Sequence, residues 1–98
     1  MTAYCYIIHS KSLDRFYVGA CQEDLDERIT KHNNHTYGSH RFTAAANDWE
    51  IFLAISVEEY AHAVRIERRI KKMKSSRYIR NLKLYPELVD KLVQKTST

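Results

Sequence analysis

Two short runs of β-branched and aromatic residues stand close together near the N-terminus and constrain the fold more than any other feature. The first covers residues 4–9 (YCYIIH), the second covers residues 16–20 (FYVGA), and a largely polar stretch of six residues separates them. Such runs favour extended chain, and so short a connection predicts an antiparallel hairpin. Because side chains alternate between faces along a strand, Tyr17 and Gly19 should share one face of the second strand.

A helix start follows the hairpin. Asp24 can accept from the first free backbone N–H groups, and Glu27 stands three residues later, which is the capping-box spacing. Apolar positions recur at helical intervals over residues 25–32, and the two asparagines that follow end the pattern. Arg28 and His32 are four residues apart, so they should lie on the same side of this helix.

The middle of the chain predicts a loop and a third strand. Residues 34–48 are polar or small and show no periodicity, so we expect a loop. This loop carries His35, Tyr37, His40, Arg41 and Thr43. Residues 49–55 (WEIFLAI) are again rich in β-branched and aromatic side chains and predict a strand.

Three helices should complete the chain. Ser56 and Glu59 have the spacing of a second capping box and predict a helix over about residues 57–73. Ser76 can cap a third helix that runs through residue 84, and Pro86 suits the first turn of a last one. The apolar stripe of that last helix consists of Leu88, Val89, Leu92 and Val93.

This order of elements predicts an α+β fold in which helices cover a small antiparallel sheet. The 98 residues, 44% of them apolar, are enough for one core. We therefore expect one domain over residues 1–98, with a C-terminal helical extension at about residues 85–96.

Composition argues against several classes of protein. With two glycines and one proline, the chain is neither low-complexity nor collagen-like. It has neither an apolar run long enough to span a membrane nor a secretory signal pattern. Cys5 and Cys21 are too few for a disulfide framework, and the cysteines and histidines lack zinc-site spacing. We expect a reduced, cytoplasmic protein that does not enter membranes.

Positive charge is concentrated in one segment. Residues 65–83 contain nine basic residues and a single acid, so they carry +8 in a chain whose net charge is +4. The basic residues are Arg65, Arg68, Arg69, Lys71, Lys72, Lys74, Arg77, Arg80 and Lys83. A solvated helix face usually mixes both signs, whereas an unmixed cluster is typical of a surface that binds nucleic acid.

The single acid in that segment is Glu67. On a helical projection it falls between Ala63 and Tyr60, on the buried side of the predicted helix. A carboxylate there needs a partner. That partner can be a buried arginine, which would make the pair structural, or a divalent metal ion that faces phosphate.

These residues together resemble a known family. Tyr4-Cys5-Tyr6 and Tyr17-Val18-Gly19 stand eleven residues apart, tyrosine to tyrosine. The helix with Arg28 and His32 follows, and then the tract at residues 63–75 (AVRIERRIKKMKS), which contains Glu67. In this order and spacing the set resembles the GIY-YIG nuclease domain, in particular its small single-domain bacterial members. The similarity runs from about residue 4 to residue 82, and the first motif reads Tyr-Cys in place of the family's Gly-Ile.

The resemblance implies a three-stranded antiparallel sheet flanked by helices, and hydrolysis of DNA phosphodiesters with one Mg²⁺ or Mn²⁺ ion. The positions that match the family's catalytic residues are Tyr6, Tyr17, Arg28, His32 and Glu67, with Glu67 as the metal ligand. The resemblance favours Tyr6 as proton acceptor, with Tyr17 or His32 as a relay. Arg28 should grip a phosphate oxygen, and Asn81 matches a late asparagine of the family.

A metal-dependent DNA endonuclease, selective for DNA structure rather than sequence, is therefore the leading hypothesis. The residues expected to contact DNA are Arg65, Arg68, Arg69, Lys71, Lys72, Lys74, Arg77 and Asn81. One alternative is a catalytically silent nucleic-acid-binding module on the same fold. Another is an interaction protein that docks through its C-terminal helix. We expect DNA as the partner, no small-molecule cofactor, and a monomer or weak homodimer.

Overall fold

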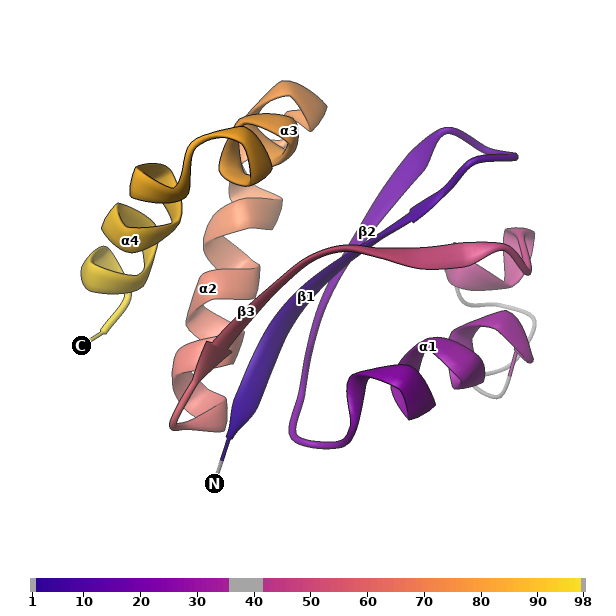
Figure 1. Ribbon diagram of the computed structural model, residues 1–98, viewed down its shortest axis with the longest axis horizontal. Coiled ribbons are helices and arrows are strands. Elements are labelled where there is room, and N and C mark those ends of the chain that lie inside the picture. Colours follow the sequence, from indigo (N-terminus) through magenta and orange to yellow (C-terminus); the bar gives the residue numbers. More distant parts are fainter. Residues whose placement is uncertain (1, 36–41, 98) are drawn as a thin grey trace.

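The computed structural model describes residues 2–35 and 42–97 and contains the predicted hairpin and third strand (Figure 1). The strands are β1 (Ala3–Ser10), β2 (Arg15–Cys21) and β3 (Trp49–Val57). They form an antiparallel sheet in the order β2-β1-β3, so β1 is central and β2 is an edge strand. The predicted fold class, α+β with a three-stranded antiparallel sheet, is confirmed.

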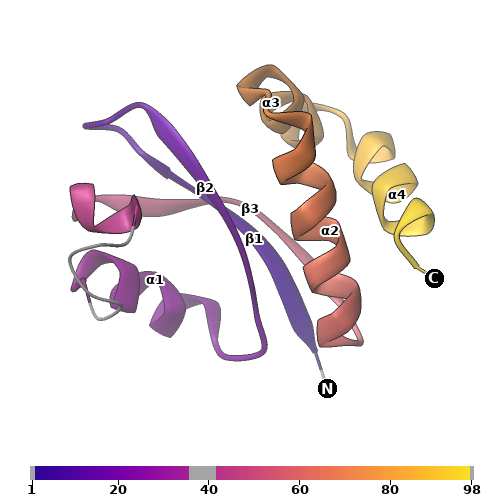
Figure 2. The same cartoon turned by 180° about the vertical axis from the view of Figure 1, so that it is seen from behind.

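The sheet lies between two helical layers (Figures 1 and 2). Helix α1 (Leu25–Asn33) covers one face, and α2 (Tyr60–Met73) crosses the other and packs on all three strands. Helices α3 (Ser76–Leu84) and α4 (Pro86–Lys95) follow on the α2 side. The two faces of the sheet are therefore separate environments, each with its own apolar cluster.

The strand register assigns residues to those faces. Tyr6 pairs with Gly19 and Ile8 pairs with Tyr17, so all four positions face α1. Cys5 lies on the opposite face, in the cluster that includes the buried side of α2. The tyrosines thus lie on one face of the sheet, and α2, which carries Glu67, lies on the other.

Local capping signals predicted some helix starts and missed others. Asp24 caps α1, because its Oδ2 accepts from the backbone N–H of Glu27 at 3.2 Å. The predicted second capping box is wrong: β3 continues to Val57, and α2 begins at Tyr60 without a side-chain cap. Ser56 pairs instead with Tyr4 at the start of β1, and Glu59 stands at the N-cap of α2, so the strand ladder outweighs the predicted cap.

Helix α3 begins one residue earlier than predicted, because its cap is Ser75 and not Ser76. The Ser75 Oγ accepts from the backbone N–H of Tyr78 at 3.1 Å. The left-handed residue Lys74 (φ 49°) ends α2 just before it and forces the sharp turn between the two helices.

The connection between α1 and β3 contains a short 3-10 helix, η1 (Phe42–Ala45), which the sequence did not predict. Its short, non-periodic sequence leaves no repeat to detect. Three residues expected in this loop lie outside the described part of the chain: Tyr37, His40 and Arg41.

The apolar stripe of α4 packs on the domain's own core. Leu92 is buried, and Leu88, Val89 and Val93 pack around the cluster between α2 and the sheet. This contact gives the stripe a function within the fold. Among the described residues, no helix is both long and apolar enough to cross a bilayer.

Candidate active site

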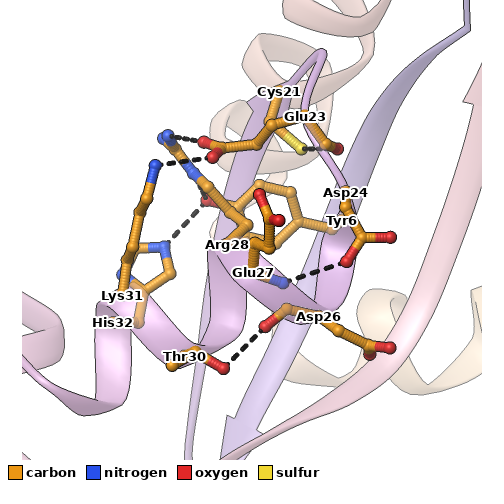
Figure 3. Close-up of polar contacts among 10 residues, drawn as sticks. All are labelled: Tyr6, Cys21, Glu23, Asp24, Asp26, Glu27, Arg28, Thr30, Lys31 and His32. Atoms are coloured by element: carbon orange, nitrogen blue, oxygen red, sulfur yellow. Dashed lines mark hydrogen bonds and ion pairs between the residues drawn. The ribbon is translucent and has the colours of Figure 1, made fainter.

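The hydroxyl of Tyr6 is the centre of a buried polar network (Figure 3). Arg28 Nε donates to Tyr6 Oη at 3.1 Å, and His32 Nε2 lies 2.9 Å from the same oxygen. On the other side of the ring, His32 Nδ1 lies 2.9 Å from Thr43 Oγ1. Tyr6 is 0% exposed, His32 3% and Thr43 2%, so water does not reach this network.

The direction of these hydrogen bonds follows from counting donors. Arg28 can only donate, so the Tyr6 oxygen accepts from it. Within the described part of the chain, the acceptor in reach of the Tyr6 O–H is His32 Nε2. A neutral His32 then carries its proton on Nδ1 and donates to Thr43. The network therefore draws the phenolic proton of Tyr6 towards His32.

Gly19 is what allows the Tyr6 ring to take this position. The two residues are cross-strand partners, and the ring folds over the backbone of Gly19 towards the edge of the sheet. A Cβ atom at Gly19 would stand 2.5 Å from Tyr6 Cζ, well inside van der Waals contact. The φ angle of Gly19 lies outside the left-handed region, so the glycine is needed for space and not for backbone conformation.

The base of the long loop is fixed, and this places Thr43. The Asn33 side chain bonds both backbone groups of Trp49, at 2.7 Å to N and 3.0 Å to O, and so joins the end of α1 to the start of β3. The Trp49 indole N–H then donates to the backbone oxygen of Thr43 at 2.8 Å. The Thr43 hydroxyl is held in this way against His32.

Arg28 is held in place by an acid as well as by Tyr6. Its Nη1 lies 2.8 Å from Glu23 Oε1, and Lys31 Nζ lies 2.7 Å from the other carboxylate oxygen. Hydrogen bonds from Lys31 and Arg28 lower the pKa of Glu23, so the acid is ionised at neutral pH. The Arg28 side chain remains 25% exposed, and its guanidinium is the part of the network nearest to solvent.

Burial makes the Tyr6 hydroxyl a weak acid. Desolvation raises the pKa of Tyr6 far above its usual range, and the hydrogen bond and charge of Arg28 only partly oppose this. The pKa of Cys5, on the other face, is raised to about 12, first by burial and next by the carboxylate of Glu67. Glu67 belongs to α2, which packs on the face of the sheet that Cys5 occupies.

Lys71 connects the two sides around the edge strand β2. Its Nζ lies 2.5 Å from Glu67 Oε2 and 5.5 Å from the centre of the Tyr17 ring. The Tyr17 ring in turn lies 5.2 Å from that of His32 and 6.5 Å from that of Tyr6. All five predicted catalytic residues thus belong to one continuous cluster, and Lys71 closes it.

The comparisons with known proteins agree with this geometry. A family model, the GIY-YIG catalytic domain, matches residues 2–81 of the 98-residue chain. The chain belongs to the GIY-YIG family. Searches among curated proteins and among solved structures returned no match. Membership identifies a nuclease-type hydrolase, an enzyme class whose substrates are nucleic acids.

The basic residues of this GIY-YIG domain do not form a single patch. Lys71 and Lys74 line a cavity of about 300 Å³ between β2 and the corner where α2 meets α3, together with Arg15. Arg69 lines a different hollow, between α2 and α4. Arg65 Nε donates to the backbone oxygen of Thr96 at 2.6 Å, at the C-terminal end of the fold.

The remaining predicted contacts with nucleic acid are Arg68, Lys72 and Arg77, which are exposed, and Asn81, which is partly buried on α3. The role of the whole set stays a prediction. By position, Lys71 and Lys74 are the members that share a cavity beside the Tyr17 edge.

The donor set of this GIY-YIG site fits a hard divalent cation that keeps most of its water. No group of three His, Cys, Asp or Glu side chains is found among residues 2–35 and 42–97. Glu67 offers one carboxylate, whose side chain is 20% exposed. Mg²⁺ is commonly bound by one or two carboxylates, with water and phosphate oxygens as its other ligands, so a single acid suffices.

The expected structural alternative for Glu67 was a bridge to a buried arginine such as Arg28. In the structure Glu67 pairs with Lys71, and Arg28 pairs with Glu23. Sequence reasoning missed the contributions of Glu23, Thr43 and Arg15. For Glu23 a signal existed, because it lies five and eight residues before the two cations that it binds. Thr43 depends on a loop closure that no local pattern reveals.

Proposed function

We propose that this protein is a divalent-metal-dependent endonuclease that hydrolyses phosphodiester bonds in DNA, selecting DNA structure rather than sequence. One observation carries the proposal: Tyr6, Tyr17, Arg28, His32 and Glu67 lie in one cluster that begins in a buried hydrogen-bond network and ends at a carboxylate on α2. The link between the carboxylate and the tyrosines is the ammonium of Lys71, which pairs with Glu67 and lies over the ring of Tyr17.

Each residue of the cluster has a chemical task in this proposal. Arg28 binds a non-bridging oxygen of the phosphate and offsets the charge that develops there. Glu67 holds the cation, which when bound supplies positive charge at the phosphate and acidifies its water. Tyr6 anchors Arg28 and His32 from within the core.

Burial distinguishes the two tyrosines as proton acceptors. Tyr6 is wholly buried with a raised pKa, whereas Tyr17 is partly exposed on the edge strand, beside the Lys71 ammonium. A proton acceptor must be reachable by the attacking water, and of the two tyrosines Tyr17 is the one with exposed surface. We therefore assign the proton acceptor to Tyr17, in place of Tyr6, with His32 next to it.

Phenylalanine variants test this division of roles. Tyr6→Phe removes the shared partner of Arg28 and His32 in a dry site, so it should lower the free energy of unfolding by about 1 to 3 kcal/mol. Tyr17→Phe keeps the ring of a partly exposed residue, so it should cost less stability than Tyr6→Phe and lower the cleavage rate by about 10² or more. Full activity in Tyr17→Phe would return the role of base to Tyr6.

Plasmid nicking with Mg²⁺ or Mn²⁺ tests the activity itself, and a panel of duplex, flap, fork and single-stranded DNA tests the selectivity. Glu67→Gln is the matched inactive variant. It should abolish nicking, keep DNA affinity, and leave the melting temperature nearly unchanged, because the partner ammonium of Lys71 is 48% exposed and stays hydrated. DNA binding without nicking in any divalent metal would favour the silent binding module instead.

A further inference from the structure

The carboxylate of Glu67 already forms an ion pair with the ammonium of Lys71. The two residues are one helical turn apart on α2, and their charged atoms lie 2.5 Å apart. The same Nζ lies 5.5 Å from the centre of the Tyr17 ring, which gives it a second favourable contact. A divalent ion bound by Glu67 would therefore have to share this place with a positive charge or displace it.

The two partners differ in how easily they can move. The Glu67 side chain is 20% exposed, whereas the Lys71 side chain is 48% exposed on a flexible stem. A half-exposed ammonium gains little from one ion pair and regains water when it leaves. Lys71 is thus the partner that gives way.

A destination for the ammonium lies next to it. Lys71 also lines the cavity of about 300 Å³ between β2 and the α2–α3 corner, with Arg15 and Lys74. Three cationic side chains around one opening favour a phosphate group there, although Asp14 lies on the same rim. Turning from Glu67 into this cavity would let Lys71 exchange a carboxylate for a phosphate.

We propose that Lys71 couples cation loading to DNA binding. In the free protein it neutralises Glu67 and competes with the divalent ion; when DNA binds, a phosphate attracts the ammonium and the carboxylate becomes available. This inference rests on the proposed function, since it takes Glu67 as the cation ligand. It makes Lys71 a positioning residue that acts through Glu67.

Thermodynamic linkage gives the expected sign of the effect of DNA on cation affinity. If DNA raises the affinity for the cation by some factor, the cation must raise the affinity for DNA by the same factor. Removing the charge of Lys71 removes the competitor in the free protein, so Lys71→Met should bind Mn²⁺ about tenfold more tightly than wild type. The same variant should show a smaller effect of DNA on cation binding, because no ammonium is left to move.

The cation measurement needs no enzymatic activity. Free Mn²⁺ is followed by electron paramagnetic resonance during titration of the wild-type protein, Lys71→Met, Glu67→Gln and the control Lys72→Met. Lys72 is the next residue and is also exposed, so the control loses the same net charge. We expect Lys72→Met to match wild type in Mn²⁺ affinity, whereas its affinity for DNA alone should fall with the lost charge. Lys71→Gln serves as a second variant, and a melting curve confirms the fold of each protein.

The coupling is measured from the DNA side. Fluorescence anisotropy of a labelled duplex gives the DNA affinity with and without Ca²⁺, and a gel of the same sample checks that the duplex stays intact. The ratio of the two affinities should be similar in wild type and Lys72→Met and should fall clearly in Lys71→Met.

The outcomes separate this inference from the proposed function. Unchanged Mn²⁺ affinity in Lys71→Met, with binding lost in Glu67→Gln, would overturn the coupling and leave the cation site intact. Mn²⁺ binding that survives in Glu67→Gln would overturn the cation site itself. An equal DNA-affinity ratio in Lys71→Met and Lys72→Met would also refute a specific role of Lys71.

Discussion

Replacing Gly19 by alanine should displace the Tyr6 ring through one steric clash and so disrupt the site. The added Cβ would lie 2.4 Å from Tyr6 Oη and 2.5 Å from Cζ. Neither side can yield easily, because the Tyr6 ring is fully buried and its hydroxyl is bonded to Arg28 and His32. The backbones of the two residues are also paired across the strands.

The expected cost follows from these contacts. Overpacking in a tight core costs roughly 1 to 3 kcal/mol, and each hydrogen bond lost by the displaced Tyr6 hydroxyl adds about 1 kcal/mol. We expect Gly19→Ala to lower the free energy of unfolding by about 3 kcal/mol. In a domain of this size that is a fall in melting temperature of about 10 to 20 °C. Cleavage should fall too, because Arg28 and His32 lose their common anchor.

A double-mutant cycle isolates the contact. In a Tyr6→Leu background the ring is absent, and alanine is a better strand residue than glycine by roughly 0.5 to 1 kcal/mol. There, Gly19→Ala should be neutral or slightly stabilising in urea unfolding. An equal loss of stability in both backgrounds would show that Gly19 is needed for another reason, and the steric account of the Tyr6 position would be refuted.

Three further predictions concern the surface and the helix ends. Arg15→Ala combined with Lys74→Ala should make the slope of log DNA affinity against log salt shallower by up to about 2, whereas Arg69→Ala, on another side of α2, should leave the slope unchanged. The pKa of Glu23 is lowered by its two cations, so its stabilisation is present above about pH 4.3 and is lost as pH falls through the lower folded value. The stability advantage of wild type over Glu23→Gln should therefore shrink on acidification. Ser75→Ala should cost about 1 kcal/mol in chemical unfolding, and the same change one residue later should cost less.

The sequence was informative where a local interaction determines the structure. The hairpin follows from two runs of strand-forming residues, and Asp24 caps α1 as its spacing predicts. Prediction from the sequence failed where a residue distant in the chain determines the local structure. Ser56 and Glu59 have ideal capping spacing, but residues at the start of β1 pair with the end of β3 and keep that segment extended. A capping rule considers four consecutive residues and therefore does not include pairing with a distant strand.

The sequence predicted which residues gather in the candidate site, and their catalytic roles stay a prediction. Family resemblance selected Tyr6, Tyr17 and Glu67, and the structure brings them together. Burial cannot be obtained from a motif, so the sequence could not distinguish the two tyrosines as bases. It also could not predict that Thr43 supports His32, because that contact depends on how a loop of about fifteen residues closes.

The path of the cluster explains how residues on opposite faces of the sheet can belong to one candidate site. Tyr6 and Glu67 belong to opposite faces of the sheet, which in most folds would keep them apart. They are connected here because β2 is an edge strand. The absence of a side chain at Gly19 lets the Tyr6 ring lean towards this edge. From α2, the long side chain of Lys71 reaches around β2 to the Tyr17 ring. In the free protein the Tyr6 hydroxyl is thus already bonded to His32, and the Glu67 carboxylate is already paired with Lys71. Under the proposed coupling, incoming DNA replaces the second of these contacts before cleavage, and a short or neutral side chain at position 71 would remove that requirement.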